Sequence, residues 1–276
     1  MIYLPKDTFR NLNVKDIDNY YLKLYKVPYF DDKNKKFRFF VPKGKGQPEI
    51  DNYSTDFSTV DFESLLKRIE SSLNSLGMFV RSMKFGTDWR LIVGLGGASV
   101  YETSMTLHHI YGIPYIPGSA VKGILRSWTI LRFFENEENR ALDNCGFCQI
   151  FGSPLKSALG DYKGAVRFFD AFPVQRPTVS LDIMNPHYGP YYSEGKAPTD
   201  DNDPKPITFL TVKNTTFQFF VGVEAKKNQE IETEPFGGRK PLDFVIELLP
   251  EALSWHGIGA KTAVGYGYMS QTEERT

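Results

Sequence analysis

The spacing of hydrophobic residues predicts three amphipathic helices. Apolar side chains recur every three or four positions, which places them on one face of a helix. The expected helices span residues 58–77, 119–131 and 241–253. Ser58 resembles the first residue of a capping box and Ser119 is a good N-cap, because a serine hydroxyl accepts a hydrogen bond from the free backbone N–H groups of a first helical turn.

Extended segments separate these helices. Branched apolar residues followed by glycines predict a strand at 89–95, and alternation of apolar and polar positions predicts one at 217–224. Two more strands are expected at 164–174 and 264–269. With the last two helices, these elements read strand, helix, strand, strand, helix, strand. The expected fold class is therefore α+β, with a ferredoxin-like βαββαβ core.

Two segments are expected outside that core. Residues 1–88, which include the first helix, would form an N-terminal extension, followed by the core at 89–276. A stretch rich in proline, tyrosine and aspartate interrupts the core at about 175–206. A connection of that length is too long for two neighbouring strands, so we expect it to have a function of its own.

Composition narrows the class of protein. No apolar run is long enough to cross a membrane, the N-terminus lacks the pattern of a signal peptide, and two cysteines are too few for a disulfide framework. A cytoplasmic protein is therefore expected. The 33 basic and 33 acidic residues cancel, which argues against a chain wrapped wholly in nucleic acid, yet residues 103–134 and 252–272 contain no acid at all.

The first acid-free stretch combines a tight turn with a cationic helix. The N–H groups at a helix N-terminus favour an anion, and here they follow Gly118 and Ser119. Lys122 and Arg126 are four residues apart and therefore share a face. Gly123 lowers the stability of a helix, and a close approach of a ligand to the backbone would explain why glycine occupies this position. A phosphate group is the natural occupant, and the alternative is an ordinary amphipathic helix with solvated cations.

The second acid-free stretch contains a glycine-rich loop, GIGAKTAVGYG at 257–267, which we expect to be flexible. It lacks the spacing of a nucleotide-binding loop, as does GLGGAS at 94–99. Its N–H groups can still lie along a sugar-phosphate backbone. The candidate contacts are Gly259, Lys261, Thr262, Gly265 and Gly267. The alternative is that the glycines only permit unusual backbone dihedrals.

Two residue pairs have weaker support as functional sites. Cys145 and Cys148 supply two of the four ligands that a structural zinc ion needs, and no histidine spacing completes the set. A packed thiol pair is favoured, and no metal or other cofactor is expected. His108 and His109 would suit acid–base cleavage of RNA. Because no other residue is tied to them by spacing, a structural or RNA-contacting role is favoured.

Together these motifs resemble a known family. GIPYIPGSAVKGILR (112–126) resembles the signature of the RAMP proteins of CRISPR-Cas systems, a G-x-P-x-I-P-G-S-x-x-K-G-x-x-R element that opens the first helix of a modified RRM fold. The loop at 257–267 looks like the glycine-rich loop near the C-terminus of the same superfamily. CQIFGS with GAVRFFDAFPV is similar to a middle block of its backbone-forming members. LDIMNPHYGPYY and PITFLTV look most like one subunit of the type III-B effector, the Cmr complex.

The resemblance implies a guide-RNA-binding subunit without nuclease activity. Lys122, Arg126 and the glycine loop would hold the backbone of the guide RNA (crRNA) and help to present it to target RNA, beside other Cmr subunits, namely backbone RAMP subunits and the small subunit. His187 is a further expected RNA contact, and 175–206 would be the hairpin that family members insert between bases. In a sister subunit the cleaving aspartate lies in the loop before the signature. The comparable residue here is Glu102, so no cleavage by this chain is expected.

Two other functions stay open at this point. Other RAMP proteins are metal-independent endoribonucleases that process guide RNA precursors, and His108 or His109 would then be catalytic. A nucleotide-binding enzyme would use the glycine loops, although both lack the required spacing.

Overall fold

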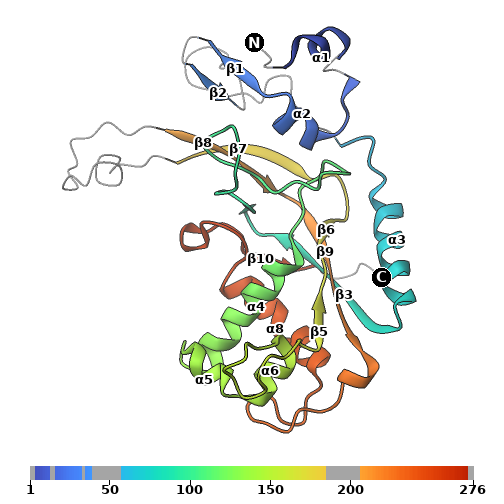
Figure 1. The fold of residues 1–276 in the computed structure, drawn as a ribbon, viewed down its shortest axis with the longest axis vertical. Helices are drawn as coiled ribbons and strands as arrows, with labels where there is room; N and C mark the ends of the chain where they lie inside the picture. The colour runs from blue at the N-terminus through green and yellow to red at the C-terminus, as the bar shows by residue number, and fades with distance from the viewer. Residues whose placement is uncertain (1–3, 13–15, 33–34, 39–56, 185–205, 273–276) are drawn as a thin grey trace, which may run out of the picture. The chain divides into compact units, whose positions relative to one another are not determined.

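The protein forms two compact units. A computed structural model describes residues 4–12, 16–32, 35–38, 57–184 and 206–272 (Figure 1). Unit 1 comprises Met1–Val60, Gly94–Pro114 and Thr178–Val212, and unit 2 comprises Asp61–Val93, Tyr115–Pro177 and Lys213–Thr276. The cationic helix and the glycine-rich loop both belong to unit 2, so their mutual arrangement is defined within one unit.

An antiparallel sheet forms the centre of unit 2. Its order is β10 (Met269–Gln271), β3 (Met78–Thr87), β9 (Thr216–Glu224) and β5 (Val166–Phe168), and the short β6 (Phe172–Pro173) also pairs with β9. β3 and β9 pair along their whole lengths, from Met78 opposite Glu224 to Gly86 opposite Thr216. The expected α+β class is confirmed, and the strands of this sheet pair antiparallel.

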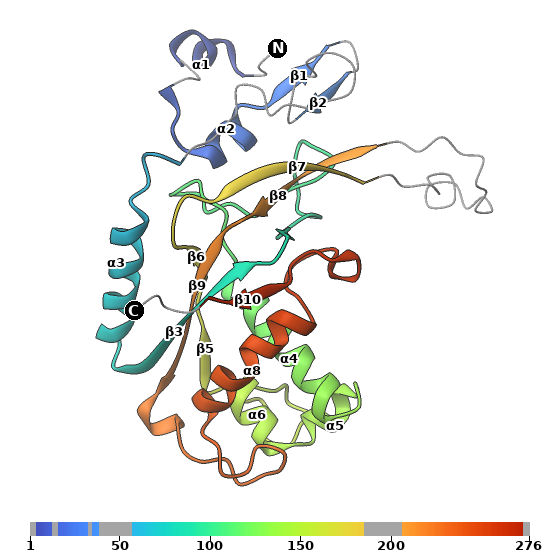
Figure 2. The ribbon, with the colours of Figure 1, turned by 180° about the vertical axis from the view of Figure 1, so that it is seen from behind.

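Helices lie on both sides of this sheet. α4 (Gly118–Phe133) and α8 (Pro241–Trp255) lie together on one side, and α3 (Phe62–Ser75) runs beside β3 on the other, in both views (Figures 1 and 2). Between α4 and α8 in the chain come α5 (Glu138–Leu142), α6 (Cys145–Phe151) and the 3-10 turn η2 (Ala225–Lys227). The core is aromatic: Phe85 of β3 and Phe219 of β9 are fully buried and meet edge to face at 5.2 Å.

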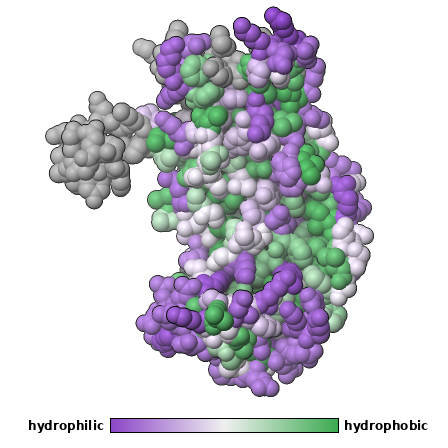
Figure 3. Space-filling model, viewed as in Figure 1, coloured by the Kyte–Doolittle hydropathy of each residue, from purple (hydrophilic) through white to green (hydrophobic). Residues whose placement is uncertain are grey.

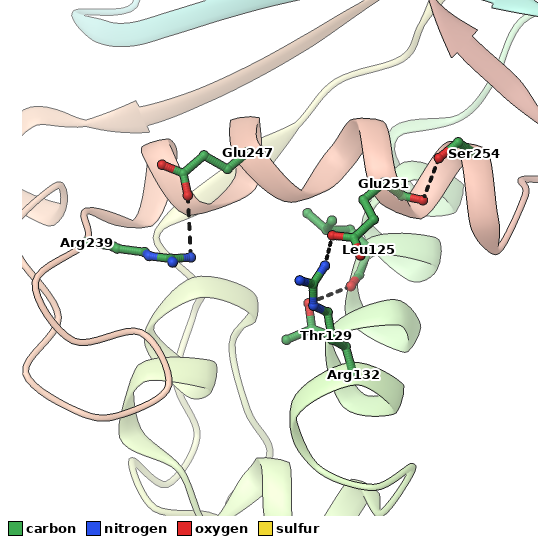
Figure 4. A network of polar contacts seen from close by, with 7 residues as sticks. All are labelled: Leu125, Thr129, Arg132, Arg239, Glu247, Glu251 and Ser254. Carbon is green, nitrogen blue, oxygen red and sulfur yellow. Dashed lines mark hydrogen bonds and ion pairs between the residues drawn. The ribbon is translucent and has the colours of Figure 1, made fainter.

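Polar contacts orient α8 against α4. Arg132 of α4 forms an ion pair with Glu251 of α8 (Figure 4). Within α4, the buried hydroxyl of Thr129 donates to the carbonyl oxygen of Leu125 at 2.7 Å, so it needs no partner on α8. Partly exposed ion pairs contribute little stability each. Apolar packing therefore holds the two helices together, and the ion pair fixes their register.

Unit 1 is built from shorter elements. These are α1 (Lys6–Asn11), α2 (Tyr20–Lys26), the antiparallel pair β1 (Tyr29–Asp31) and β2 (Lys36–Arg38), and the neighbouring strands β7 (Thr178–Met184) and β8 (Ile207–Lys213). Asn19 caps α2 through its side-chain oxygen, and its amide nitrogen donates to the carbonyl oxygens of His109 and Ile110. This contact fixes the segment before the signature onto α2.

Several predicted elements are confirmed within two residues. The helices predicted at 119–131 and 241–253 are α4 and α8, and the strand predicted at 217–224 is β9. No helix in the described part of the chain is long and apolar enough to span a membrane.

Other predicted boundaries were wrong. The strand predicted at 89–95 contains only β4 (Arg90–Leu91), and the first strand of the central sheet is β3 instead. The alternation in β3 is obscured because Phe79 is exposed at the end where the strand extends beyond the core. β3 falls within the segment 1–88 that was predicted to be an N-terminal extension, and the division at residue 88 stays a prediction.

Three further elements also differ from the prediction. The first helix begins after Asp61, whose carboxylate accepts from the Ser64 N–H at 3.0 Å, so Ser58 is not its cap. The final strand is β10 and not 264–269, because the glycine-rich loop continues through Gly267. The segment predicted as one strand at 164–174 is divided into β5 and β6.

Candidate nucleic-acid interface

The start of α4 is packed against the sheet of unit 2. Pro117 is the N-cap residue, so the expectation that Ser119 caps the helix was wrong. The Gly118 N–H donates to the Asp170 carboxylate at 2.8 Å. A Cβ on Gly118 would lie 2.3 Å from the Phe168 carbonyl oxygen, so glycine permits the close approach of α4 to β5. The first N–H group of the helix therefore already binds an anion that belongs to the protein.

Three cations converge one turn further along α4. Lys122 is half-buried, and burial lowers the pKa of its ammonium group, followed by repulsion from Arg126 and Arg167. Arg167 lies on β5, next to the start of α4. The cluster of Lys122, Arg126 and Arg167, called the cation cluster below, thus combines two residues of the signature with one that the sequence did not single out.

The members of the cation cluster differ in their partners. The Arg126 guanidinium forms an ion pair with Glu138 at 2.6 Å and lies over the Phe147 ring, 5.2 Å from its centroid. Arg167 pairs with Glu224 at 3.3 Å. Lys122 has no hydrogen bond or ion pair to any residue that the structure describes. Of the three, Lys122 is therefore the group whose charge the described protein leaves uncompensated.

The acids around the cluster lie on a polar part of the surface. Glu138 belongs to α5, and hydrophilic residues cover the end of unit 2 where α5 and α6 lie, at the bottom of the space-filling view (Figure 3). Arg140 of α5 pairs with Glu135 as well. Arg126 thus has an anionic partner on α5, whereas Lys122 has none among the described residues and still experiences repulsion from Arg126.

Gly123 has no structural reason to be glycine in the described protein. It is exposed in the middle of α4, and a Cβ there would meet no described atom within 4 Å. Glycine inside a helix costs about 0.5–1 kcal/mol relative to alanine. The expectation that something approaches this backbone is therefore compatible only with a ligand or partner outside the described residues.

Backbone hydrogen bonds hold the glycine-rich loop, both within the loop and to residues 90–92. Ile258 and Gly267 are joined by a hydrogen bond of 2.8 Å, the Ala260 N–H donates to the Ile92 carbonyl oxygen at 2.8 Å, and the Gly267 N–H donates to the Arg90 carbonyl oxygen at 2.7 Å. These bonds correct the expectation of a flexible loop. With four further backbone bonds, they withdraw seven of its N–H groups from any ligand, those of Gly257, Ile258, Ala260, Val264, Gly265, Tyr266 and Gly267.

The glycines of this loop divide into two kinds. Gly259 and Gly267 have positive φ, and a Cβ on either would lie 2.1 or 2.0 Å from a carbonyl oxygen of Ile92 or Ile258. Gly265 also has positive φ but is exposed and meets only Trp89 at 3.9 Å. Gly259 and Gly267 therefore serve close packing, whereas Gly265 lies on the outer side of the loop.

The remaining candidates of the loop lie at its turn. Lys261 adopts a left-handed backbone with φ 62° and is the residue before the 3-10 turn η3 (Thr262–Val264). Lys261 and Thr262 are both partly exposed. The turn therefore presents a cation and a hydroxyl on a loop whose frame is rigid.

A hydrogen bond joins the region of α4 to the start of the loop. Ser127, directly after Arg126, lies 3.1 Å from Nε2 of His256, and His256 directly precedes the loop. The Trp128 ring lies 5.9 Å from the His256 ring. Unit 2 thus brings both sequence motifs together through a histidine that sequence reasoning did not use. Its position just before GIG was the signal that could have identified it.

The predicted histidine pair lies in unit 1. The rings of His108 and His109 stack at 5.3 Å, and His108 stacks on Tyr111 at 4.7 Å. Nδ1 of His108 accepts from the Tyr111 N–H at 3.4 Å. Glu102 is exposed in the same unit. His187 and most of the segment 175–206 lie outside the described residues.

The cysteine pair is packed in α6. Cys148 is buried, and its thiol donates to the carbonyl oxygen of Leu142 at 3.2 Å, while Cys145 is partly exposed. Within the described ranges, no group of three or more histidine, cysteine or acidic side chains is arranged to hold a metal ion. This geometry agrees with a packed thiol pair.

Comparison with known proteins identifies a matching family and several similar proteins. Residues 84–270 match the RAMP superfamily. The chain is 38% identical to the CRISPR system Cmr subunit Cmr6 of Pyrococcus furiosus over an alignment of 236 residues. The match covers 67% of this chain and 66% of that protein, just under two thirds of its length. It is 26% identical to the CRISPR system Cmr subunit Cmr6 of Saccharolobus solfataricus over 252 residues, 88% of this chain and 76% of that protein. A chain in the cryo-EM structure of the type III-B Cmr-beta bound to cognate target RNA has a similar fold, with a TM-score of 0.58 and 24% identity over 81% of this chain and 68% of that one.

Proposed function

This chain belongs to the RAMP superfamily, and within it we propose a Cmr6-like subunit that binds the guide RNA of a type III-B effector complex without cutting it. The two curated relatives are both Cmr subunits named Cmr6. That agrees with the resemblance of residues 181–192 and 206–212 to one Cmr subunit. The proposed partners are crRNA, target RNA, the backbone RAMP subunits and the small subunit.

We further propose that unit 2 is a ferredoxin-like core. The chain order β3, α4, β5, β9, α8, β10 is strand, helix, strand, strand, helix, strand. The sheet order β10, β3, β9, β5 places the first and third strands in the centre and the second and fourth at the edges. Both orders support this core, with unit 1 formed by the segments around it.

The observation that carries the RNA-binding proposal is the uncompensated charge of Lys122. An ammonium group that is half-buried beside two guanidinium groups is unfavourable unless an anion offsets it, and this is the cause of its lowered pKa. A phosphate of a single strand supplies that anion without any base-specific contact. The exposed Gly123 directly beside Lys122 leaves room for the strand to approach the backbone of α4.

The other expected contacts take narrower roles in this proposal. Gly118 positions the start of α4 against Phe168. Arg126, in the middle of α4, pairs with Glu138 of α5 and adds positive charge near Lys122. Ser119 is exposed at the first turn and can donate its hydroxyl to a phosphate.

In the loop, Lys261, Thr262 and Gly265 are the outward groups that would contact the strand. Gly259 and Gly267 give the loop its shape.

The test is a salt titration of RNA binding by the full chain. We expect Lys122→Ala to weaken binding of unrelated single-stranded RNA sequences alike and to reduce the slope of log K against log salt by about 0.7, the share of one phosphate. Lys67→Ala is the matched control, because Lys67 is also a helical lysine of unit 2 but forms an ion pair with Glu63 on α3. An unchanged slope for Lys122→Ala, or a change in sequence preference alone, would contradict the phosphate contact.

A further inference from the structure

Trp89 is a large aromatic side chain that the fold leaves half in solvent. It lies two residues after the end of β3, directly before β4, and is 51% exposed. Its indole packs on the ring of Tyr266 with centroids 4.7 Å apart and planes tilted by 44°. Tyr266 is itself buried in the glycine-rich loop. The indole is therefore supported from the protein side while much of its surface stays accessible.

The surroundings of Trp89 are the outer side of that loop. The Arg90 guanidinium lies 5.7 Å from the indole centroid, and the backbone of Arg90 accepts the Gly267 N–H. Gly265 lies beside the indole, and a Cβ added to it would be 3.9 Å from the ring. The Trp89 indole, the Arg90 guanidinium and the loop backbone at Gly265 thus lie together within unit 2.

The other two tryptophans do not share this arrangement. Trp255 is more exposed, at 72%, but no described ring packs against it. Trp128 is partly buried in α4 and lies against His256. Support by a buried ring distinguishes Trp89, because an indole fixed in place loses little side-chain entropy when a planar ligand stacks on it.

We propose that Trp89 stacks on a nucleobase of the bound RNA strand, next to the phosphates that the glycine-rich loop faces. This inference rests on the proposed function, since it requires RNA at the loop. Stacking is indifferent to base identity, because every base has a π-face. A nearby guanidinium and the Lys261 turn favour a polyanion over an apolar protein partner at this position.

The experiment compares two strands of equal length, one of ordinary RNA and one of abasic ribose-phosphate. We expect Trp89→Ala to lose about 5- to 100-fold in affinity for ordinary RNA, the range for one stacked base, and to bind the abasic strand like the parent protein. Trp89→Phe should keep most of the affinity, and Trp255→Ala is the matched control for loss of an exposed indole. Lys122→Ala should lose affinity for both strands.

A fluorescence measurement keeps the test independent of the alanine variant's folding. In a Trp128→Phe, Trp255→Phe protein, Trp89 is the only tryptophan. We expect its emission to be quenched by ordinary RNA and unchanged by the abasic strand. Equal quenching by both strands, or equal affinity of Trp89→Ala and parent for ordinary RNA, overturns the stacking proposal and leaves the Lys122 result standing. If Trp89→Ala instead loses only its capture of other Cmr subunits, the indole is a protein contact and the proposal is also overturned.

Discussion

The two sequence motifs of unit 2, the start of α4 and the glycine-rich loop, are built in the same way. In each, some signature residues hold the motif to the sheet and others lie open. Gly118 packs on Phe168 as Gly259 packs on Ile92, while Gly123 and Gly265 are exposed. Substitutions within one signature should therefore have different effects. Changing a packed glycine should lower the stability of the fold, whereas changing an exposed one should alter the surface available to RNA.

The motifs differ in how they treat their cations. α4 pairs Arg126 with Glu138 and leaves Lys122 uncompensated, whereas the loop places Lys261 at a left-handed turn. In α4 the positive field comes from several side chains of two elements. In the loop the groups that we propose to contact RNA are one cation, one hydroxyl and the exposed Gly265. We therefore expect α4 to contribute more to the salt dependence of binding and the loop more to the position of the strand.

The largest effect is expected from Gly267→Ala. A Cβ would lie 2.0 Å from the Ile258 carbonyl oxygen at a φ of 79°, so packing and backbone strain combine. We expect the free energy of unfolding to fall by about 2–5 kcal/mol, measured by urea denaturation. Gly265→Ala is the matched control, with φ strain alone and a loss of about 1 kcal/mol. Equal losses for both would show that the loop is not clamped at Gly267.

A smaller loss of stability is expected from Arg126→Ala. The change removes the ion pair with Glu138 and the contact with the Phe147 ring, together worth about 1–2 kcal/mol for partly exposed groups. Glu138→Gln, which removes only the ion pair, should cost less than half of that. Thermal unfolding measures both. An Arg126→Ala protein with unchanged stability and a loss of RNA affinity equal to that of Lys122→Ala would place Arg126 against RNA instead of α5.

These contrasts also show how far sequence alone reaches. Helical periodicity predicted α4 and α8 because their apolar residues face a single core. Cation spacing and glycines indicated both motifs, and the resemblance then related them to a family. The neighbours of the α4 motif were not visible in the sequence, because Asp170 lies 52 residues from Gly118, Arg167 lies 45 residues from Lys122, and Glu224 lies 57 residues from its partner Arg167. β3 was missed because its sequence begins with three consecutive apolar residues, Met78 to Val80, and so does not alternate between apolar and polar positions.

Gly123→Ala is expected to act in opposite directions on stability and binding. Alanine should stabilise α4 by about 0.5–1 kcal/mol, because no described atom opposes a methyl group there and glycine is a poor helix former. If RNA approaches this backbone, the same methyl group should weaken RNA binding. Urea denaturation and RNA titration of one preparation measure both. A stabilised protein with unchanged affinity for RNA would mean that the strand does not pass over Gly123.

The smallest effect, no change in cleavage, is expected in unit 1. Glu102 is exposed, and in the described residues it joins no cluster that would hold a metal ion. Reconstituted complexes with Glu102→Ala should therefore cut target RNA at the same number of sites as the parent complex.

The histidine pair requires a separate experiment, in which the pure chain is incubated with repeat RNA and EDTA. Because Nδ1 of His108 already accepts a backbone hydrogen bond and its ring is stacked between His109 and Tyr111, it is held as a structural group, and we expect no discrete cuts. Cuts that disappear in His108→Ala or His109→Ala would assign unit 1 a guide-processing activity and make unit 2 its RNA-positioning part.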